Sequence, residues 1–179
     1  MLLTIEERKL FFSNWLRLLT FVNNSCNIIP DFGAPDNPAG LDIGNILKIR
    51  NKLWENSSLI DQYLKESDLN DEDFQIVNSW KKYINEDFIV IKELKKFCVM
   101  LDSKKEILYG VSAISNPLSE IIPFFPSFVK TALIPFKGRI IYDSIVVNSN
   151  VRFGSNYKKS LNISYAGIKK KKGIITVLE

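Results

Sequence analysis

The spacing of apolar residues changes near residue 87, and this change constrains the fold more than any other feature of the sequence. Before it, Phe11, Trp15 and Leu18 recur three or four positions apart, as on one face of a helix. After it, residues 88–94 and 97–101 form short runs of branched and aromatic residues, as strands do. Helices and strands in separate blocks predict an α+β protein.

The first half of the chain predicts four helices. Thr4 and Glu7 have the spacing of a capping box, in which each side chain accepts a hydrogen bond from the other residue's backbone amide. Residues 29–40 are rich in Pro and Gly and predict a loop. The acidic run at 68–73 fits a helix start better than a calcium loop, because the glycine and distal glutamate of such a loop are missing. The predicted helices cover residues 4–24, 41–54 and 58–66, with a fourth beginning in the acidic run.

The second half predicts a mainly antiparallel sheet of five or six strands, or a partial barrel, with a C-terminal helix. Lys137 and Gly138 fit a two-residue reversal in which Gly takes a positive φ. Pro135 lacks an amide hydrogen and belongs at a sheet edge or strand end. The predicted strands are 88–94, 97–101, 107–111, 129–136 and 139–147, followed by a helix over 155–167 and an edge strand over 174–178. We divide the chain into a helical region, 1–86, and a sheet region, 87–179, and expect one compact unit.

The stretch LIPFKGRIIYDS at 133–144 resembles a motif of a family of uncharacterised bacterial proteins. The resemblance extends to the pattern from Trp80 to Val111 before this stretch and to short motifs after it, at 152–154, 165–166 and 173–176. The family motif is close to LPFKxxIIYDG, and some members carry a zinc-binding SEC-C module. The resemblance covers about residues 74–178 and implies strands and a bacterial cytoplasmic origin, with no catalytic residues to transfer. This chain has Ser144 in place of the motif's glycine and no cysteine after Cys98, so the zinc module is absent.

Several classes of enzyme are excluded by composition. The chain has no histidine, which removes Ser-His-Asp and Cys-His mechanisms and histidine-based metal sites. Its two cysteines, Cys26 and Cys98, are too few for a zinc site, and we expect both to be reduced, with Cys98 in the core. Neither glycine-rich phosphate-loop motif occurs. We therefore predict no metal and no cofactor.

Charge is distributed unevenly along the chain. Residues 1–90 hold 9 Lys and Arg against 14 Asp and Glu, whereas residues 91–179 hold 15 against 6. A basic C-terminal half is typical of a surface that contacts nucleic acid or another polyanion, or an acidic protein, although lysines also solvate ordinary surfaces. Tyr157 and Tyr165 are candidates for stacking on bases. The predicted nucleic-acid-binding residues are Lys137, Arg139, Arg152, Lys158, Lys159, Lys169, Lys170, Lys171 and Lys172.

The sequence favours a non-enzymatic binding or interaction module and leaves two alternatives. One is a metal-dependent hydrolase or nuclease that uses carboxylate, Lys or Tyr chemistry around Asp143 and Arg139. Adjacent strand residues face opposite sides, so Tyr142 and Asp143 are expected to point one inward and one outward, with Asp143 in a surface ion pair. The other is a scaffold or accessory subunit that binds through its aromatic N-terminal helices, and the same aromatic face could form a homodimer. No segment has the pattern of a secretory signal or a membrane span, and we expect a cytoplasmic protein.

Overall fold

The computed structural model describes residues 2–30, 32 and 42–179, so most of the loop predicted at 29–40 lies outside the described residues. The chain forms two compact units. A helical unit covers residues 4–81, and a sheet unit consists of residues 82–179 with the N-terminal residues 2–3. The boundary predicted at 86/87 falls inside the first strand, because the alternating residues from Ile84 onward already pair with another strand.

The helical unit confirms the predicted succession of helices. In α1, the Thr4 hydroxyl accepts a hydrogen bond from the Glu7 amide at 3.2 Å, and the Glu7 carboxylate accepts one from the Thr4 amide at 2.9 Å. The predicted capping box is therefore formed. The helices are α1 (Ile5–Cys26), α2 (Ile43–Glu55), α3 (Ser58–Glu66) and α4 (Asp71–Ser79), and the last is followed by the 3-10 turn η1 (Trp80–Lys82).

Aromatic side chains fill the interior of the helical unit. The Trp15 ring lies 5.9 Å from the Trp54 ring and 5.6 Å from the Trp80 ring, measured between centroids. Phe11 packs against Trp15 and Trp80, and all four side chains are buried. Large aromatic side chains contribute much of the free energy of a core through buried area. These four side chains are therefore interior, whereas Phe74 of α4 is 38% exposed.

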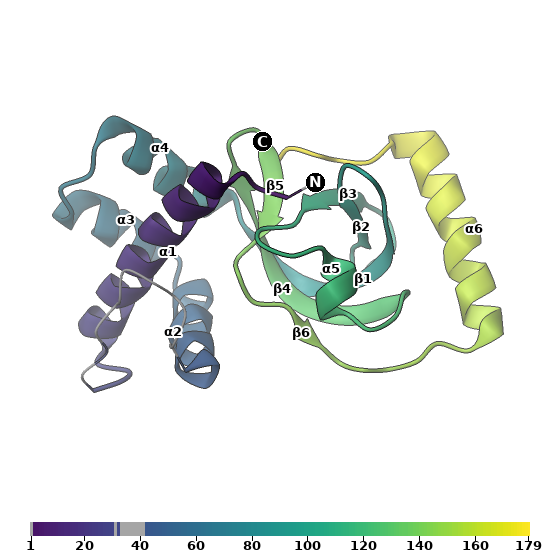
Figure 1. Cartoon of the computed structure of the whole chain (residues 1–179), viewed down its shortest axis with the longest axis horizontal. Coiled ribbons are helices and arrows are strands. Elements are labelled where there is room, and N and C mark those ends of the chain that lie inside the picture. The colour runs from purple at the N-terminus through teal and green to yellow at the C-terminus, as the bar shows by residue number, and fades with distance from the viewer. Residues whose placement is uncertain (1, 31, 33–41) are drawn as a thin grey trace. The chain divides into compact units, whose positions relative to one another are not determined.

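The sheet unit contains a six-stranded, mostly antiparallel sheet, as the sequence predicted (Figure 1). The strand order is β1-β2-β3-β5-β4-β6, and β1 also pairs with β4, so five strands close into a ring. The parallel pair is β3 with β5. Closing the ring leaves few unpaired strand edges. The strands are β1 (Ile84–Glu93), β2 (Cys98–Leu101), β3 (Leu108–Ser112), β4 (Ser127–Phe136), β5 (Arg139–Tyr142) and β6 (Val147–Asn148).

The β4–β5 hairpin has the predicted two-residue turn. Lys137 has φ 48° and Gly138 has φ 72°, and left-handed conformations at both positions match the twist of the flanking strands. Pro135 pairs with β5, but the pairing of β4 with β1 stops at Leu133, so the proline lies at the strand end as expected. The prediction that the second strand continues to 147 was wrong, because Ser144, at φ 77°, turns the chain after Tyr142.

Two helices of the sheet unit differ from the prediction. The short helix α5 (Leu118–Ile121) was not expected among the prolines; the Glu93 carboxylate accepts hydrogen bonds from its first amides, of Leu118 and Ser119. The final helix, α6 (Ser155–Lys172), runs five residues beyond the predicted end at Gly167. A helix tolerates one glycine at a cost of about 1 kcal/mol, and the lysines that follow are good helix formers.

The chain after α6 returns to the sheet. The Gly110 amide donates to the Ile175 carbonyl and the Ile175 amide donates to the Leu108 carbonyl, both at 2.8 Å. This is a single parallel bridge with β3 and not the longer edge strand predicted for 174–178. A Cβ atom on Gly110 would lie 3.0 Å from Phe97 and from the Thr176 methyl group, so the close approach of the tail requires glycine.

We expect Gly110→Ala to lower the free energy of unfolding by about 1–3 kcal/mol, because the added methyl group overpacks the space between Phe97 and Thr176. Denaturant titration measures this change. Gly167→Ala is the control, since a Cβ there meets nothing within 4 Å and alanine favours the helix. Equal stability of Gly110→Ala and the parent protein would contradict the described packing.

The two thiols should differ in reactivity. Burial, followed by the charge of Glu93, raises the pKa of the Cys98 thiol to about 12, whereas Cys26 is partly exposed. At pH 8 a disulfide reagent should therefore modify Cys26 readily and Cys98 only after unfolding, because a pKa raised from 9.0 leaves about a thousandfold less thiolate. The shift also predicts that stability declines as the pH rises above 9, where the unfolded chain ionises first. Rapid modification of both thiols in the native protein would refute this assignment.

Candidate polyanion-binding surface

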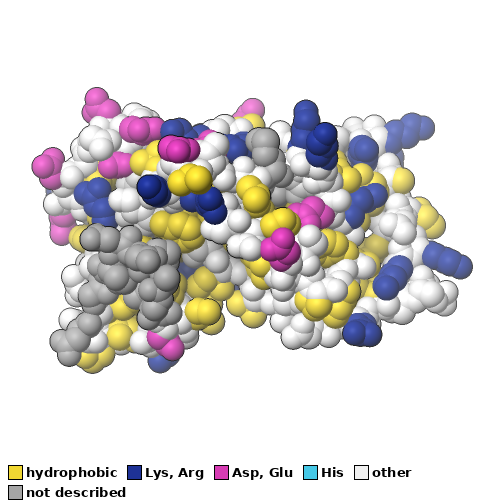
Figure 2. Space-filling model, in the orientation of Figure 1, with side chains coloured by type: hydrophobic (Ala, Val, Ile, Leu, Met, Phe, Trp, Pro, Cys, Tyr) yellow, Lys and Arg dark blue, Asp and Glu magenta, His cyan; other side chains and the backbone are white. Residues whose placement is uncertain are grey.

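Helix α6 carries charge of one sign. Six of its 18 residues are lysines and none is acidic. The sheet unit to which it belongs holds 16 Lys and Arg against 8 Asp and Glu. Figure 2 shows Lys and Arg side chains over α6. We call α6 the basic helix.

One face of the basic helix is held against the sheet. Tyr157, Leu161, Tyr165 and Ile168 recur at helical spacing and pack on β1, β2 and β3. Leu161 is 2% exposed and Tyr165 is 9% exposed. Because these strands are covered by the helix on one side and by the ring interior on the other, they read as nearly continuous apolar runs. The strand residues beneath the helix are Ile89, Ile91, Val99, Leu101 and Leu108.

The rings of Tyr157 and Tyr165 make cation–π contacts with lysine side chains. The ammonium groups of Lys92 and Lys169 lie 4.1 Å and 5.8 Å from the centroid of the Tyr165 ring. The Lys105 ammonium lies 4.8 Å from the Tyr157 ring, which also stacks on Phe153 at 4.7 Å. Each such cation–π contact is worth about 0.5–1 kcal/mol at an exposed site. The rings predicted to stack on bases therefore bind lysines instead, and Tyr165 is buried.

The opposite face of the basic helix is exposed. Residues 11 positions apart return to the same side after three turns, so Lys169 lies in line with Lys158, and Lys170 with Lys159, about 16 Å along the axis. Lys159 and Lys170 point away from the sheet, whereas Lys158 and Lys169 flank the inner face, where Lys169 approaches Tyr165. Between the pairs, the Ile163 side chain is 74% exposed. We call this set the outer face, and it consists of Lys158, Lys159, Asn162, Ile163, Ala166, Lys169 and Lys170, all exposed.

The lysines of the basic helix are not neutralised. None of the six forms an ion pair with any residue that the structure describes. In the helical unit, by contrast, Lys81 pairs with Asp61 at 2.9 Å. Unpaired like charges on one helix repel one another and lower its stability by a few tenths of a kcal/mol per pair. A polyanion bound to the outer face would relieve that repulsion.

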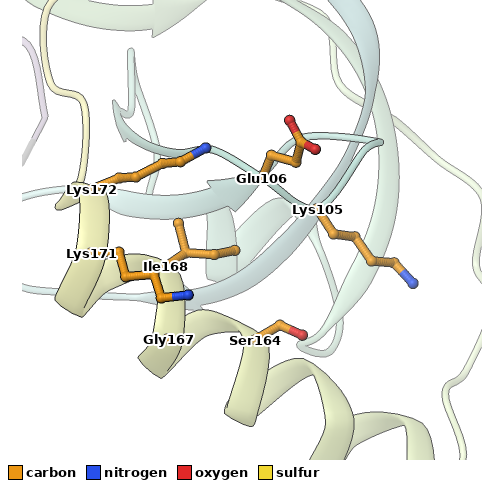
Figure 3. A pocket seen from close by; sticks show the side chains of 7 residues that line it. All are labelled: Lys105, Glu106, Ser164, Gly167, Ile168, Lys171 and Lys172. Carbon is orange, nitrogen blue, oxygen red and sulfur yellow. The ribbon is translucent and has the colours of Figure 1, made fainter.

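Lys171 and Lys172 turn towards the sheet and line a groove beside the β2–β3 connection (Figure 3). The groove has a volume of about 310 Å³ and is open to solvent. Figure 3 shows Lys105 pointing away from the two helix lysines, and a carboxylate also lines the groove. The groove is therefore mixed in charge, unlike the outer face. Its lining includes Ser164, Ile168, Lys171 and Lys172 from the helix and Lys105 and Glu106 from the connection.

Of the other predicted binding residues, two lie away from the basic helix and one lies just before it. Lys137 and Arg139 are at the β4–β5 turn, and Figure 1 shows β1, β2 and β3 between that hairpin and α6. Arg152 precedes the helix, and its guanidinium lies 5.1 Å from the Phe124 ring. The positive side chains thus gather on a helix packed outside the sheet, and the strands themselves contribute few of them.

Two residues of the enzyme alternative, Tyr142 and Asp143, are buried, and Arg139 is partly exposed. Asp143 is 0% exposed and Tyr142 is 3% exposed, so the expectation that one of them points outward was wrong. The chain turns at Ser144, which removes Asp143 from regular strand alternation; its amide donates to the Ala132 carbonyl. Burial raises the pKa of the Tyr142 hydroxyl. Asp143 does not line the groove of Figure 3, and the described residues contain no group of three or more Asp, Glu or Cys that could hold a metal ion.

Sequence reasoning missed Lys92 and Lys105, whose positions depend on contacts between strand or turn and helix. The six lysines of α6 were predicted as one binding set, with no distinction between those of the outer face and those that line the groove. The signal was present in the spacing, because 158–159 and 169–170 differ by three helical turns. The two sets were not distinguished because the helix was expected to end at Gly167, which left Lys169 to Lys172 without a helical face.

Comparisons with protein-family models, with curated proteins and with solved structures gave no match. Among the described helices, none is long and apolar enough to cross a membrane.

Docking of the basic helix should depend on its inner face. We expect Leu161→Ala to cost about 3 kcal/mol and to expose the lysines of α6 to trypsin, because the buried leucine joins the helix to the sheet. The rate of tryptic cleavage within 155–172 measures this exposure. Ile163→Ala, on the outer face, is the matched control and should leave the rate unchanged. Equal rates for the two variants would show that the helix is not held by this contact.

Proposed function

We propose that this protein binds nucleic acid through the outer face of α6 and is not itself an enzyme. The observation that supports the proposal is the set of six lysines on one 18-residue helix, with no acidic residue in the helix and no ion pair to a described residue. Neutralising phosphates releases counterions, and this release supplies much of the affinity of proteins for nucleic acids.

The geometry of the helix supports several phosphate contacts at once. The two lysine pairs lie about 16 Å apart along the helix, and duplex DNA carries a negative charge about every 1.7 Å along its axis. At the first turn of the helix, Gly154 provides no capping side chain and no carboxylate is present. The positive end of the helix dipole therefore adds to the attraction that Lys158 and Lys159 exert on a phosphate.

An acidic protein is the competing partner. We favour nucleic acid because the outer face is charged at both ends and presents one large apolar side chain, Ile163. Protein interfaces instead concentrate aromatic and apolar residues in a core from which lysine is depleted. The aromatic side chains of α6 lie on its inner face, where such a partner does not reach them.

The test is a titration of fluorescent single-stranded and duplex oligonucleotides, followed by anisotropy, at several salt concentrations. We expect replacement of Lys158, Lys159, Lys169 and Lys170 by Gln to lower the slope of log Kobs against log salt by about three, because each contact contributes about 0.7–0.9. At about 0.1 M salt this corresponds to a loss of at least tenfold in affinity.

The charge-matched control replaces Lys9, Lys48, Lys52 and Lys65, four exposed lysines of the helical unit, by Gln. This variant has the same net charge as the first, and its salt slope should equal that of the parent protein. An equal loss in both variants would mean that total charge, not the outer face, attracts nucleic acid. No binding by the parent protein to any probe would reject the proposed function.

A further inference from the structure

We infer that the outer face of α6 enters the major groove of duplex DNA and reads base edges with Asn162, Ile163 and Ala166. This inference rests on the proposed function and adds to it a form of nucleic acid and a set of reading residues. Lysines attract any polyanion, and they carry no information about sequence. Any preference for a base sequence must therefore come from the three residues between the lysine pairs.

The three central residues have the chemistry of base readers. An asparagine amide can donate to and accept from the exposed edge of adenine, and apolar side chains contact the methyl group of thymine. Asn162 and Ala166 are exposed, and Ile163 is 74% exposed. All three side chains are therefore accessible to a ligand.

The dimensions of the helix also fit. The major groove is about 12 Å wide, and an α-helix with its side chains is about 10–12 Å across. Two lysine pairs about 16 Å apart reach the phosphates at both edges of such a groove when the helix crosses it at an angle. The central residues then lie over the floor of the groove. Single strands present no comparable pair of edges.

The helix is accessible on the required side. Its contacts with the sheet are made by the inner face, through Leu161 and Tyr165, and Figure 1 shows strands on one side of α6 within the sheet unit. The helix is also fixed at both ends. At its start, Phe153 stacks on Tyr157 of the first turn, and after its end, Ile175 forms a bridge with β3. A helix held in this way can enter a groove without losing its own order.

The experiment selects bound duplexes from a library with 12 randomised base pairs, using the full chain. We expect A·T-containing sites to be enriched, and a selected duplex to bind at least tenfold more tightly than its scrambled version. Replacing thymine by deoxyuridine in the selected site, which removes only the methyl group, should weaken binding severalfold. Asn162→Ala and Ile163→Ala should each reduce the preference for the selected site and leave the salt slope unchanged.

Ser160→Ala is the matched control, because Ser160 is exposed on α6 but lies outside the outer face, and it should keep the full preference. If no duplex sequence is enriched, or if Asn162→Ala and Ile163→Ala keep the preference of the parent protein, the inference fails. Salt-dependent binding without preference would leave the proposed function intact. Tighter binding to single strands than to any duplex would also overturn the inference while leaving that function intact.

Discussion

The contact between the inner face of α6 and the outer side of β1, β2 and β3 is the interaction on which the rest of the sheet unit depends. Leu161 and Tyr165 cover apolar strand residues that would otherwise face water. At about 25 cal/mol per Å² of apolar surface removed from water, this burial stabilises the strands and fixes the helix together. It also decides which lysines point outward, since the angular position of every residue on the helix follows from its buried stripe.

A cost accompanies this arrangement. Six lysines on one helix repel one another, and only some are compensated within the protein, as where Lys169 lies over Tyr165. Lysines in the last turn of a helix do interact favourably with the carbonyl end of its dipole. That effect accounts for Lys169 to Lys172, whereas Lys158 and Lys159 lie near the positive end, where a cation is disfavoured.

Local signals in the sequence predicted most of the elements, because those elements depend on neighbouring residues. The capping box of Thr4 and Glu7, the turn at Lys137 and Gly138 and the change of period near residue 87 are all short-range features. The end of β5 was missed because Ser144 adopts a conformation typical of glycine. The pairing of β1 with β4 and the position of Lys92 over Tyr165 join distant segments, and no local pattern encodes them. The lysines of the outer face were predicted, but not that a single helix carries all of them.

The ring is closed between β3 and β5 by two residue pairs, Val111 with Ile140 and Ser112 with Ile141. β2 occupies one edge of β3, so the bridge from Ile175 to Tyr109 continues along the same edge that β5 uses. The segment after α6 therefore extends the pairing along that edge of β3. Because this segment directly follows α6, a displacement of the end of the helix would pull on the strand edge at which the ring closes.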